Sequence, residues 1–237
     1  MTRTAVITGG TGGMGLATAR SLGRDHRVVL ADIDQARIDE AVADLSAAGI
    51  DATGSVCDIT DRAAVDALLD AAATGGHHVR AVVHTAGVSP QMGSAEKIAL
   101  INGIGTVHVT RSFLERAGEG DVLVNVASTA GHGLPKLLVP TAAFRVAESD
   151  PQRFVTAVAR RAGLVGKKLR SGLAYAISKT FVIWYSRSLA GAFGERGARI
   201  VTVSPGSFDT AMGRLEADHG ASDLLKTAAI KRFGRSE

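Results

Sequence analysis

The strongest constraint on this chain is a repeated alternation of short apolar segments with Ala- and Leu-rich segments of helical period. The short segments are rich in β-branched residues and lie at 4–8, 27–31, 52–56, 79–84, 121–126 and 199–204. The helical segments lie at 14–23, 35–48, 62–73, 95–117 and 174–196. Apolar strands that alternate with helices are typical of a parallel sheet covered on both faces.

Right-handed crossovers then predict a doubly wound, Rossmann-like α/β fold, with ligands at the carboxyl ends of the strands. The 237 residues can bury one sizeable core, and no internal repeat or linker divides them, so we predict a single domain over 1–237. The segment 132–170 breaks the alternation because it contains no strand-like run. Its helical periodicity favours an inserted helical lid over a disordered excursion.

Composition excludes several classes of protein. Apolar residues make up 46% and charged residues 21% of the chain, which is ordinary for a soluble globular protein. Cys57 is the one cysteine, so no internal disulfide forms, and we expect a cytoplasmic location. No signal peptide or bilayer-spanning stretch is evident. The basic cluster at 160–170 suits a solvated helix face better than a nucleic-acid site. We also expect no metal site.

The stretch VITGGTGGMG at 6–15 follows a predicted strand and leads into a predicted helix, the context that a phosphate-binding loop needs. Glycines let the backbone approach a pyrophosphate, and the helix N-terminus offers free N–H groups. The stretch fits three glycine patterns, and by itself it does not choose between them: Gly10, Gly12 and Gly15; Gly9, Gly12 and Gly15; or Gly9, Gly13 and Gly15.

Asp32 ends the second predicted strand, about 20 positions after the glycine loop. A carboxylate there accepts hydrogen bonds from the adenosine ribose and repels a 2′-phosphate. The glycine loop contains no Arg or Lys to bind that phosphate, so we predict NAD rather than NADP. A helix N-cap is the alternative role for Asp32, but Asp34 suits it better. Asp58 is placed either to contact adenine or to form a turn, and both alternatives stay open.

Tyr175 and Lys179 lie four positions apart on a predicted helix and therefore share a face. We expect the Lys179 ammonium to lower the pKa of Tyr175, so that its hydroxyl exchanges a proton with a substrate oxygen. Ser128, just past the fifth strand, is placed to donate a hydrogen bond to the same oxygen. Hydride would then pass between the substrate carbon and the nicotinamide.

These features, in this order, resemble the short-chain dehydrogenase/reductases over nearly the whole chain. TGGTGGMG matches their T-G-x-x-x-G-x-G motif, which selects Gly9, Gly13 and Gly15. The other two glycine patterns belong to enzymes with a larger or separate substrate domain. The resemblance implies that the cofactor is contacted by Gly9, Thr11, Gly13, Met14, Gly15, Asp32, Asp58, Ile59, Ala86, Gly87, Tyr175, Lys179, Pro205, Gly206 and Thr210.

The resemblance extends to three further motifs. HTAG at 84–87 is similar to the family's Asn-Asn-Ala-Gly, with His84 and Thr85 in place of the asparagines, so we expect His84 to be structural. Asn102 matches the asparagine that holds a water behind the catalytic lysine. It completes the implied catalytic set of Asn102, Ser128, Tyr175 and Lys179. SPGSFDTAM at 204–212 resembles the segment that closes over the nicotinamide.

Two features depart from most of the family. The insertion 132–170 resembles that of the bacterial 3α-hydroxysteroid dehydrogenase/carbonyl reductase type, where it blocks one usual subunit interface. We also expect the sequence to end before the family's last helix and strand. The resemblance implies a homodimer or homotetramer, in which the predicted helix 174–196 presents exposed Phe181, Trp184 and Tyr185, unless these side chains face the sheet.

We therefore expect an NAD-dependent enzyme for a lipophilic secondary alcohol or ketone, steroid- or terpenoid-like. Apolar residues in the expected substrate loops favour this substrate class. They are Val88, Met92, Leu134, Leu137, Leu138, Phe208, Met212 and Leu215. A non-catalytic dinucleotide-binding or redox-sensing protein on the same fold is the alternative. An epimerase or dehydratase that uses NAD without net turnover is a third, which the chain length and glycine spacing disfavour.

Overall fold

The computed structural model describes residues 3–219 and 230–236. Its centre is one six-stranded parallel sheet with the strand order β3-β2-β1-β4-β5-β6. The strands are β1 (Arg3–Thr8), β2 (Arg27–Asp32), β3 (Ala52–Val56), β4 (His78–His84), β5 (Val122–Val126) and β6 (Arg199–Val203). The sheet order reverses between β1 and β4, which confirms the predicted doubly wound α/β fold.

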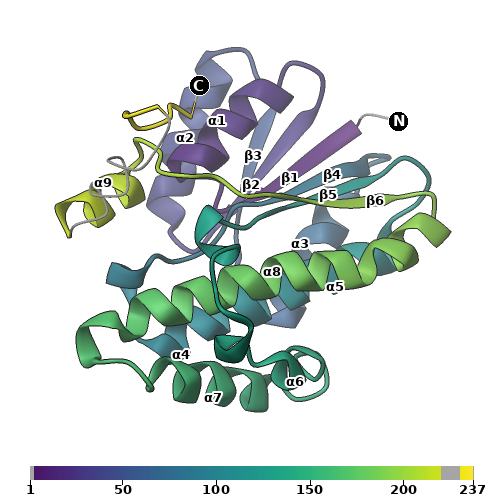
Figure 1. Cartoon of the computed structure of the whole chain (residues 1–237). Coiled ribbons are helices and arrows are strands. Elements are labelled where there is room, and N and C mark those ends of the chain that lie inside the picture. The colour runs from purple at the N-terminus through teal and green to yellow at the C-terminus, as the bar shows by residue number, and fades with distance from the viewer. Residues whose placement is uncertain (1–2, 220–229, 237) are drawn as a thin grey trace. The chain divides into compact units, whose positions relative to one another are not determined.

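The chain divides into two compact units, and the prediction of a single domain stays a prediction. Unit 1 comprises Met1–Ala86, Gly105–Val126 and Tyr185–Thr202. In this unit α1 (Gly13–Leu22) and α2 (Gln35–Ala47) lie on one face of the sheet, and α3 (Arg62–Ala72) and α5 (Gly105–Arg116) lie on the other (Figure 1). Both faces are therefore covered, as the continuously apolar strands require.

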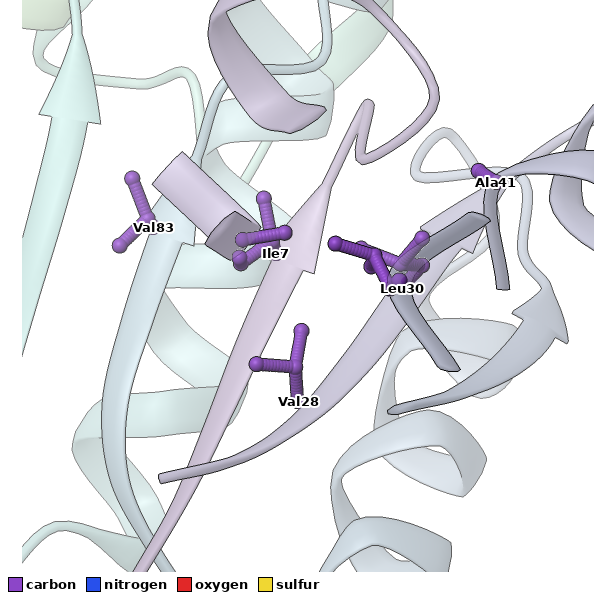
Figure 2. Close-up of a cluster of buried hydrophobic side chains, with 7 residues drawn as sticks. Ile7, Val28, Leu30, Ala41 and Val83 are labelled. Carbon is purple, nitrogen blue, oxygen red and sulfur yellow. The ribbon is translucent and has the colours of Figure 1, made fainter. Parts of the chain in front are cut away.

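A cluster of aliphatic side chains fills the layer between the sheet and α2. Ile7 of β1 and Leu30 of β2 are completely buried, and Val83 of β4 lies beside them (Figure 2). Ala41 of α2 packs on the same cluster. Burial of each large aliphatic side chain contributes about 1.5–3 kcal/mol to the stability of the fold. This layer therefore helps to hold the carboxyl ends of β1 and β2 in place.

Side-chain caps begin two helices of unit 1. The Asp34 carboxylate accepts a hydrogen bond from the Arg37 amide at the start of α2, which confirms the predicted N-cap. Asp61 caps α3 in the same way through the Ala63 amide. By contrast, Gly12 precedes α1 and offers no side chain to its first N–H groups. The N-terminus of α1 therefore keeps the uncapped donors that an anion-binding site needs.

Unit 2 comprises Gly87–Ile104, Ala127–Trp184 and Val203–Glu237. Its helices are α4 (Ala95–Ile98), α6 (Thr141–Phe144), α7 (Pro151–Ala162), the first part of α8 (Arg170–Glu195) and α9 (Ala211–Asp218). Shorter turns are η1 (Pro90–Met92), the π-helical η2 (Ala99–Ile104), η3 (Thr129–Gly131), η4 (Lys136–Leu138) and η5 (Lys167–Leu169). The segment 132–170 thus contains helices and helical turns joined by short loops, as its periodicity predicted. That it is an insertion and that it acts as a lid stay predictions.

Four aromatic rings form the core of unit 2. Phe181 of α8 lies with its ring centroid 4.5 Å from that of Phe154 on α7 and 5.1 Å from that of Phe144 on α6. Trp184 packs on Phe144 and Phe181. Of the two alternatives left open for the aromatic residues of this helix, exposure is excluded for Phe181 and Tyr185, which are 0% and 2% exposed. For Phe181 the reason is that this chain's own α6 and α7 cover it.

The predicted continuous helix 95–117 is also interrupted. It divides into α4, the π-helical turn η2 and α5. Gly103 of η2 lies against the ring of Phe154, and a Cβ at this position would lie 2.4 Å from the ring atom Cε1. The missing side chain lets α7 approach η2 closely. α8 begins at Arg170, four residues before the predicted start at 174.

Candidate active site

The glycine loop of unit 1 is shaped by close backbone contacts. Gly9 has φ +66°, a conformation that residues with a side chain rarely adopt. A Cβ on Gly15 would lie 2.3 Å from the Gly9 carbonyl oxygen, so α1 begins tightly against the end of β1. Gly13 is the first residue of α1, followed by Met14. The turn thus exposes an uncapped helix N-terminus, and these features fit a pyrophosphate.

Asp32 lies beside this loop at the end of β2. Its Oδ2 accepts a 2.5 Å hydrogen bond from the Thr11 hydroxyl, and its Oδ1 accepts one from the Ile33 amide at 2.8 Å. The Arg37 guanidinium donates to the Thr11 carbonyl at 3.3 Å. Arg37 was missed at the sequence level, because a cation was expected only within the glycine loop. The sequence feature that could have revealed it is a basic residue in the first turn of the helix after Asp32.

Other predicted cofactor residues of unit 1 have structural contacts. Asp58 Oδ1 accepts hydrogen bonds from the amide and hydroxyl of Thr60, so the turn alternative is observed and an adenine contact stays a prediction. Ile59 is buried, and its carbonyl accepts a hydrogen bond from His108 Nδ1. The backbone of Ala86 lies against Gly9. His84 is buried between the hydroxyls of Thr8 and Thr106, as its expected structural role requires.

Tyr175 and Ser128 lie together in unit 2. Ser128 precedes η3, and its hydroxyl caps that turn through the Ala130 amide. Burial raises the pKa of Tyr175, a hydrogen bond with Ser128 lowers it, and the negative charge of Glu216 raises it further. The net direction is upward, so the expected lowering by Lys179 is wrong for this structure. Removal of the phenolate from water outweighs the stabilisation that its neighbours provide.

Lys179 is buried one turn after Tyr175. Its Nζ lies 5.8 Å from the centroid of the Tyr175 ring. Burial lowers the pKa of Lys179 to about 8. A Cβ on Gly87 would lie 3.7 Å from Lys179 Nζ and 3.0 Å from Asn102 Oδ1, so the absence of a side chain at Gly87 leaves room beside both groups.

The side chain of Asn102, on the π-helical turn η2, is held by hydrogen bonds with two residues. Its Oδ1 accepts a hydrogen bond from the Val88 amide at 2.8 Å, and its Nδ2 donates to the Val88 carbonyl at 3.0 Å. Nδ2 also lies 3.2 Å from Ser178 Oγ on α8. Single π-helical turns recur at functional sites. Unit 2 thus holds all four predicted catalytic residues: Asn102, Ser128, Tyr175 and Lys179.

The predicted nicotinamide segment 204–212 contacts the residue that follows Ser128. The Pro205 carbonyl accepts a hydrogen bond from the amide of Thr129, next to Ser128, and Gly206 follows it. Thr210 caps α9 through the Gly213 amide, which gives it a structural role besides the predicted cofactor contact. A cavity of about 730 Å³ opens further along this segment. Tyr175 does not line it; the lining residues are Phe208, Asp209, Arg232, Phe233, Gly234 and Arg235.

The predicted apolar substrate residues remain accessible. Leu137 is 82% exposed, whereas Val88, Leu138, Phe208 and Met212 are half-buried. Unit 2 thus offers apolar surface that is still available to a ligand. In the described parts of the chain, no helix is both long and apolar enough to cross a bilayer. Within those parts no cluster of His, Cys, Asp and Glu could hold a metal ion.

Comparison with known proteins identifies the family. The sequence profile of the short chain dehydrogenases matches residues 3–143. The chain belongs to this family. It is 28% identical over its whole length to a short-chain dehydrogenase/reductase of Alternaria brassicicola, covering 86% of that protein. It is 31% identical to 1-deoxy-11-beta-hydroxypentalenate dehydrogenase of Streptomyces avermitilis, over 89% of this chain and 70% of the relative.

Solved structures share the fold. A variant of actinorhodin polyketide ketoreductase, solved with NADPH, superimposes with a TM-score of 0.75 at 21% identity, over 99% of this chain and 86% of that one. A short chain dehydrogenase of Burkholderia cenocepacia, solved with NADP, gives a TM-score of 0.74 at 24% identity, over 98% and 84%. As a short-chain dehydrogenase/reductase, the chain is an oxidoreductase of a family that binds a nicotinamide dinucleotide.

Proposed function

We propose that this chain transfers a hydride between NAD and a lipophilic secondary alcohol or ketone. The observation that carries the proposal is the arrangement of Ser128, Tyr175 and Lys179 in one unit, with Asn102 held beside Gly87. When bound, the nicotinamide ring would accept or donate the hydride. The protein's own residues would orient the substrate oxygen and move its proton.

Tyr175 is the proposed proton donor and acceptor. Its hydroxyl would give a proton to the carbonyl oxygen in reduction and take one from the alcohol in oxidation. Ser128, hydrogen-bonded with Tyr175, would donate to the same substrate oxygen. Lys179, with a pKa of about 8, is able to release and regain a proton near neutral pH. Asn102 would hold the water that connects Lys179 to solvent.

NAD is the proposed cofactor because of Asp32. In unit 1 its carboxylate lies next to the glycine loop, where it would accept from the ribose hydroxyls and repel a 2′-phosphate. Arg37 favours NADP as a second candidate, because its guanidinium reaches the same loop and would pair with that phosphate. The NADPH and NADP in the two solved relatives support keeping this candidate.

The substrate class is proposed from the apolar residues of unit 2. Val88 precedes η1, Met92 is its last residue, and Met212 and Leu215 lie on α9. One relative is named as the dehydrogenase of a hydroxylated compound, a hydroxypentalenate, which supports an alcohol as the substrate. We extend the proposal to a cytoplasmic homodimer or homotetramer in which 132–170 acts as a lid. A non-catalytic dinucleotide-binding or redox-sensing protein is the competing function, and the site residues named above weigh against it.

The test is reduced-nicotinamide absorbance with NAD and NADP separately, on secondary alcohols that include hydroxysteroids and cyclic terpenoid alcohols. We expect turnover with NAD, and a loss of about 10²–10⁴-fold in kcat for Tyr175→Phe. Asp32→Asn should improve the use of NADP relative to NAD, and Arg37→Ala should weaken NADP only. Cofactor binding without turnover of any substrate would favour the non-catalytic alternative, and a preference of the wild type for NADP would refute the argument from Asp32.

A further inference from the structure

Glu216 is a polar residue of unit 2 that the proposed chemistry does not use. It lies on α9 and is half-buried. Its Oε1 accepts a hydrogen bond from the backbone amide of Gln91 at 3.1 Å. Gln91 belongs to η1, which packs against α9. The carboxylate therefore joins two elements that are distant in sequence and that carry the proposed substrate-binding residues Met92 and Leu215.

η1 is in turn tied to the start of α8. The Ser171 hydroxyl donates to the carbonyl of Gly93, the residue that ends η1, at 3.3 Å. Ser171 lies one helical turn before Tyr175. These two hydrogen bonds link Glu216, through η1, to the turn of α8 that precedes Tyr175. In agreement with this placement, the negative charge of Glu216 contributes to raising the pKa of Tyr175.

Above a pH of about 8, the charges of the described neighbours leave the field of Glu216 largely uncompensated. On the same segment Arg214 forms an ion pair with Asp209, so these two charges largely cancel. The Lys97 ammonium donates to the Met92 carbonyl at the end of η1, but this side chain is exposed and is screened by solvent. Lys179 loses its charge above a pH of about 8. A half-buried carboxylate keeps more of its field than an exposed one.

We propose that Glu216 selects substrates by their charge. It disfavours ketones and alcohols with an anionic group near the reacting carbon, and it favours neutral or cationic ones. This inference rests on the proposed alcohol–ketone reaction. A carboxylate on the substrate would face Glu216 across a partly desolvated site, whereas an ammonium group would be attracted to it. We expect an effect of about tenfold on relative kcat/KM, which Coulomb interaction at a half-buried site produces.

The experiment compares three ketones of one skeleton: para-acetylbenzoate, its methyl ester, and para-acetyl-trimethylanilinium. Glu216→Gln keeps an oxygen that accepts from the Gln91 amide but removes the charge. Relative to the methyl ester, we expect it to raise kcat/KM for para-acetylbenzoate about tenfold and to lower kcat/KM for the cationic ketone. Asp218→Asn is the matched control, since Asp218 is an exposed acid on the same helix. Unchanged ratios in Glu216→Gln, or equal shifts in both variants, would overturn the proposal.

A second measurement does not need turnover. The chain has two tyrosines, Tyr175 and Tyr185, so ¹³Cζ-tyrosine NMR follows the titration of each, with Tyr185→Phe for assignment. Glu216→Gln should lower the pKa of Tyr175, and Asp218→Asn should leave it in place. A Tyr175 titration that does not move in Glu216→Gln contradicts the inference. If it moves but the wild type reduces none of the ketones, the proposed reaction fails while the link between Glu216 and Tyr175 stands.

Discussion

Replacing Lys179 with methionine should stabilise the protein while removing the proposed activity. Lys179 is buried, and burial lowers its pKa from 10.5 to about 8. The native state therefore holds the proton less tightly than the unfolded chain, which means that the charged lysine costs folding free energy. Methionine has nearly the same length, carries no charge, and fills the same space with apolar atoms.

The magnitude follows from the two pKa values. Each pH unit between them corresponds to about 1.4 kcal/mol, so the cost at pH 7 is about 3 kcal/mol. The sign is fixed by proton binding: the unfolded chain binds more protons between pH 8 and 10.5, so wild-type stability rises through this window. Lys179→Met does not titrate there. Its advantage over the wild type should be largest at or below pH 7 and should disappear as the pH approaches 10.5.

Urea unfolding of the cofactor-free protein at several pH values between 7 and 10 measures this difference, because the other titrating groups are common to both proteins. Lys168→Met is the control. This lysine is exposed on η5, and its replacement should change the free energy of unfolding by less than about 0.5 kcal/mol. The reasoning is refuted if Lys179→Met is no more stable than the wild type at pH 7, or if its advantage does not shrink with rising pH.

Two further predictions concern the glycine loop and the core of unit 2. Gly15→Ala should weaken NADH binding at least about tenfold, because its Cβ would collide with the Gly9 carbonyl, whereas Gly194→Ala has open space and should bind normally; equal affinities in a fluorescence titration would contradict this. Phe154→Ala should lower the free energy of unfolding by about 3–5 kcal/mol, since it empties a fully buried ring site. A loss in urea unfolding below about 1 kcal/mol would show that α7 contributes little to stability.

Most of the sheet could be predicted because its strands are short runs rich in β-branched residues that alternate with helical segments. The predicted segment 27–31 became Arg27–Asp32, and 52–56 matched β3. The helix 95–117 was predicted as continuous, since hydrophobic periodicity over such a length does not register one π-helical turn. The sequence also left open whether Phe181 is exposed. α8 carries apolar residues on several faces, and a helix of this kind is usually buried.

The candidate site was predictable where it depends on local spacing. Tyr175 and Lys179 share a helix face, and Ser128 follows a strand, so the sequence alone brought these residues forward. Arg37 and Glu216 were not predicted, because tertiary contacts between segments distant in sequence give them their place. Arg37 reaches the glycine loop from the first turn of α2, and Glu216 reaches η1 from α9.

Spacing also failed to predict protonation. Four positions on a helix place Lys179 near Tyr175, but the sequence does not report how much water either group loses. In the structure, burial dominates both groups: it raises the pKa of Tyr175 and lowers that of Lys179. The raised pKa leaves the Tyr175 hydroxyl protonated well above neutral pH, which suits a proton donor, and burial brings the pKa of Lys179 down to about 8. The burial of Lys179 that costs stability is the same feature that suits it to proton transfer, and proteins commonly accept such a cost at functional sites.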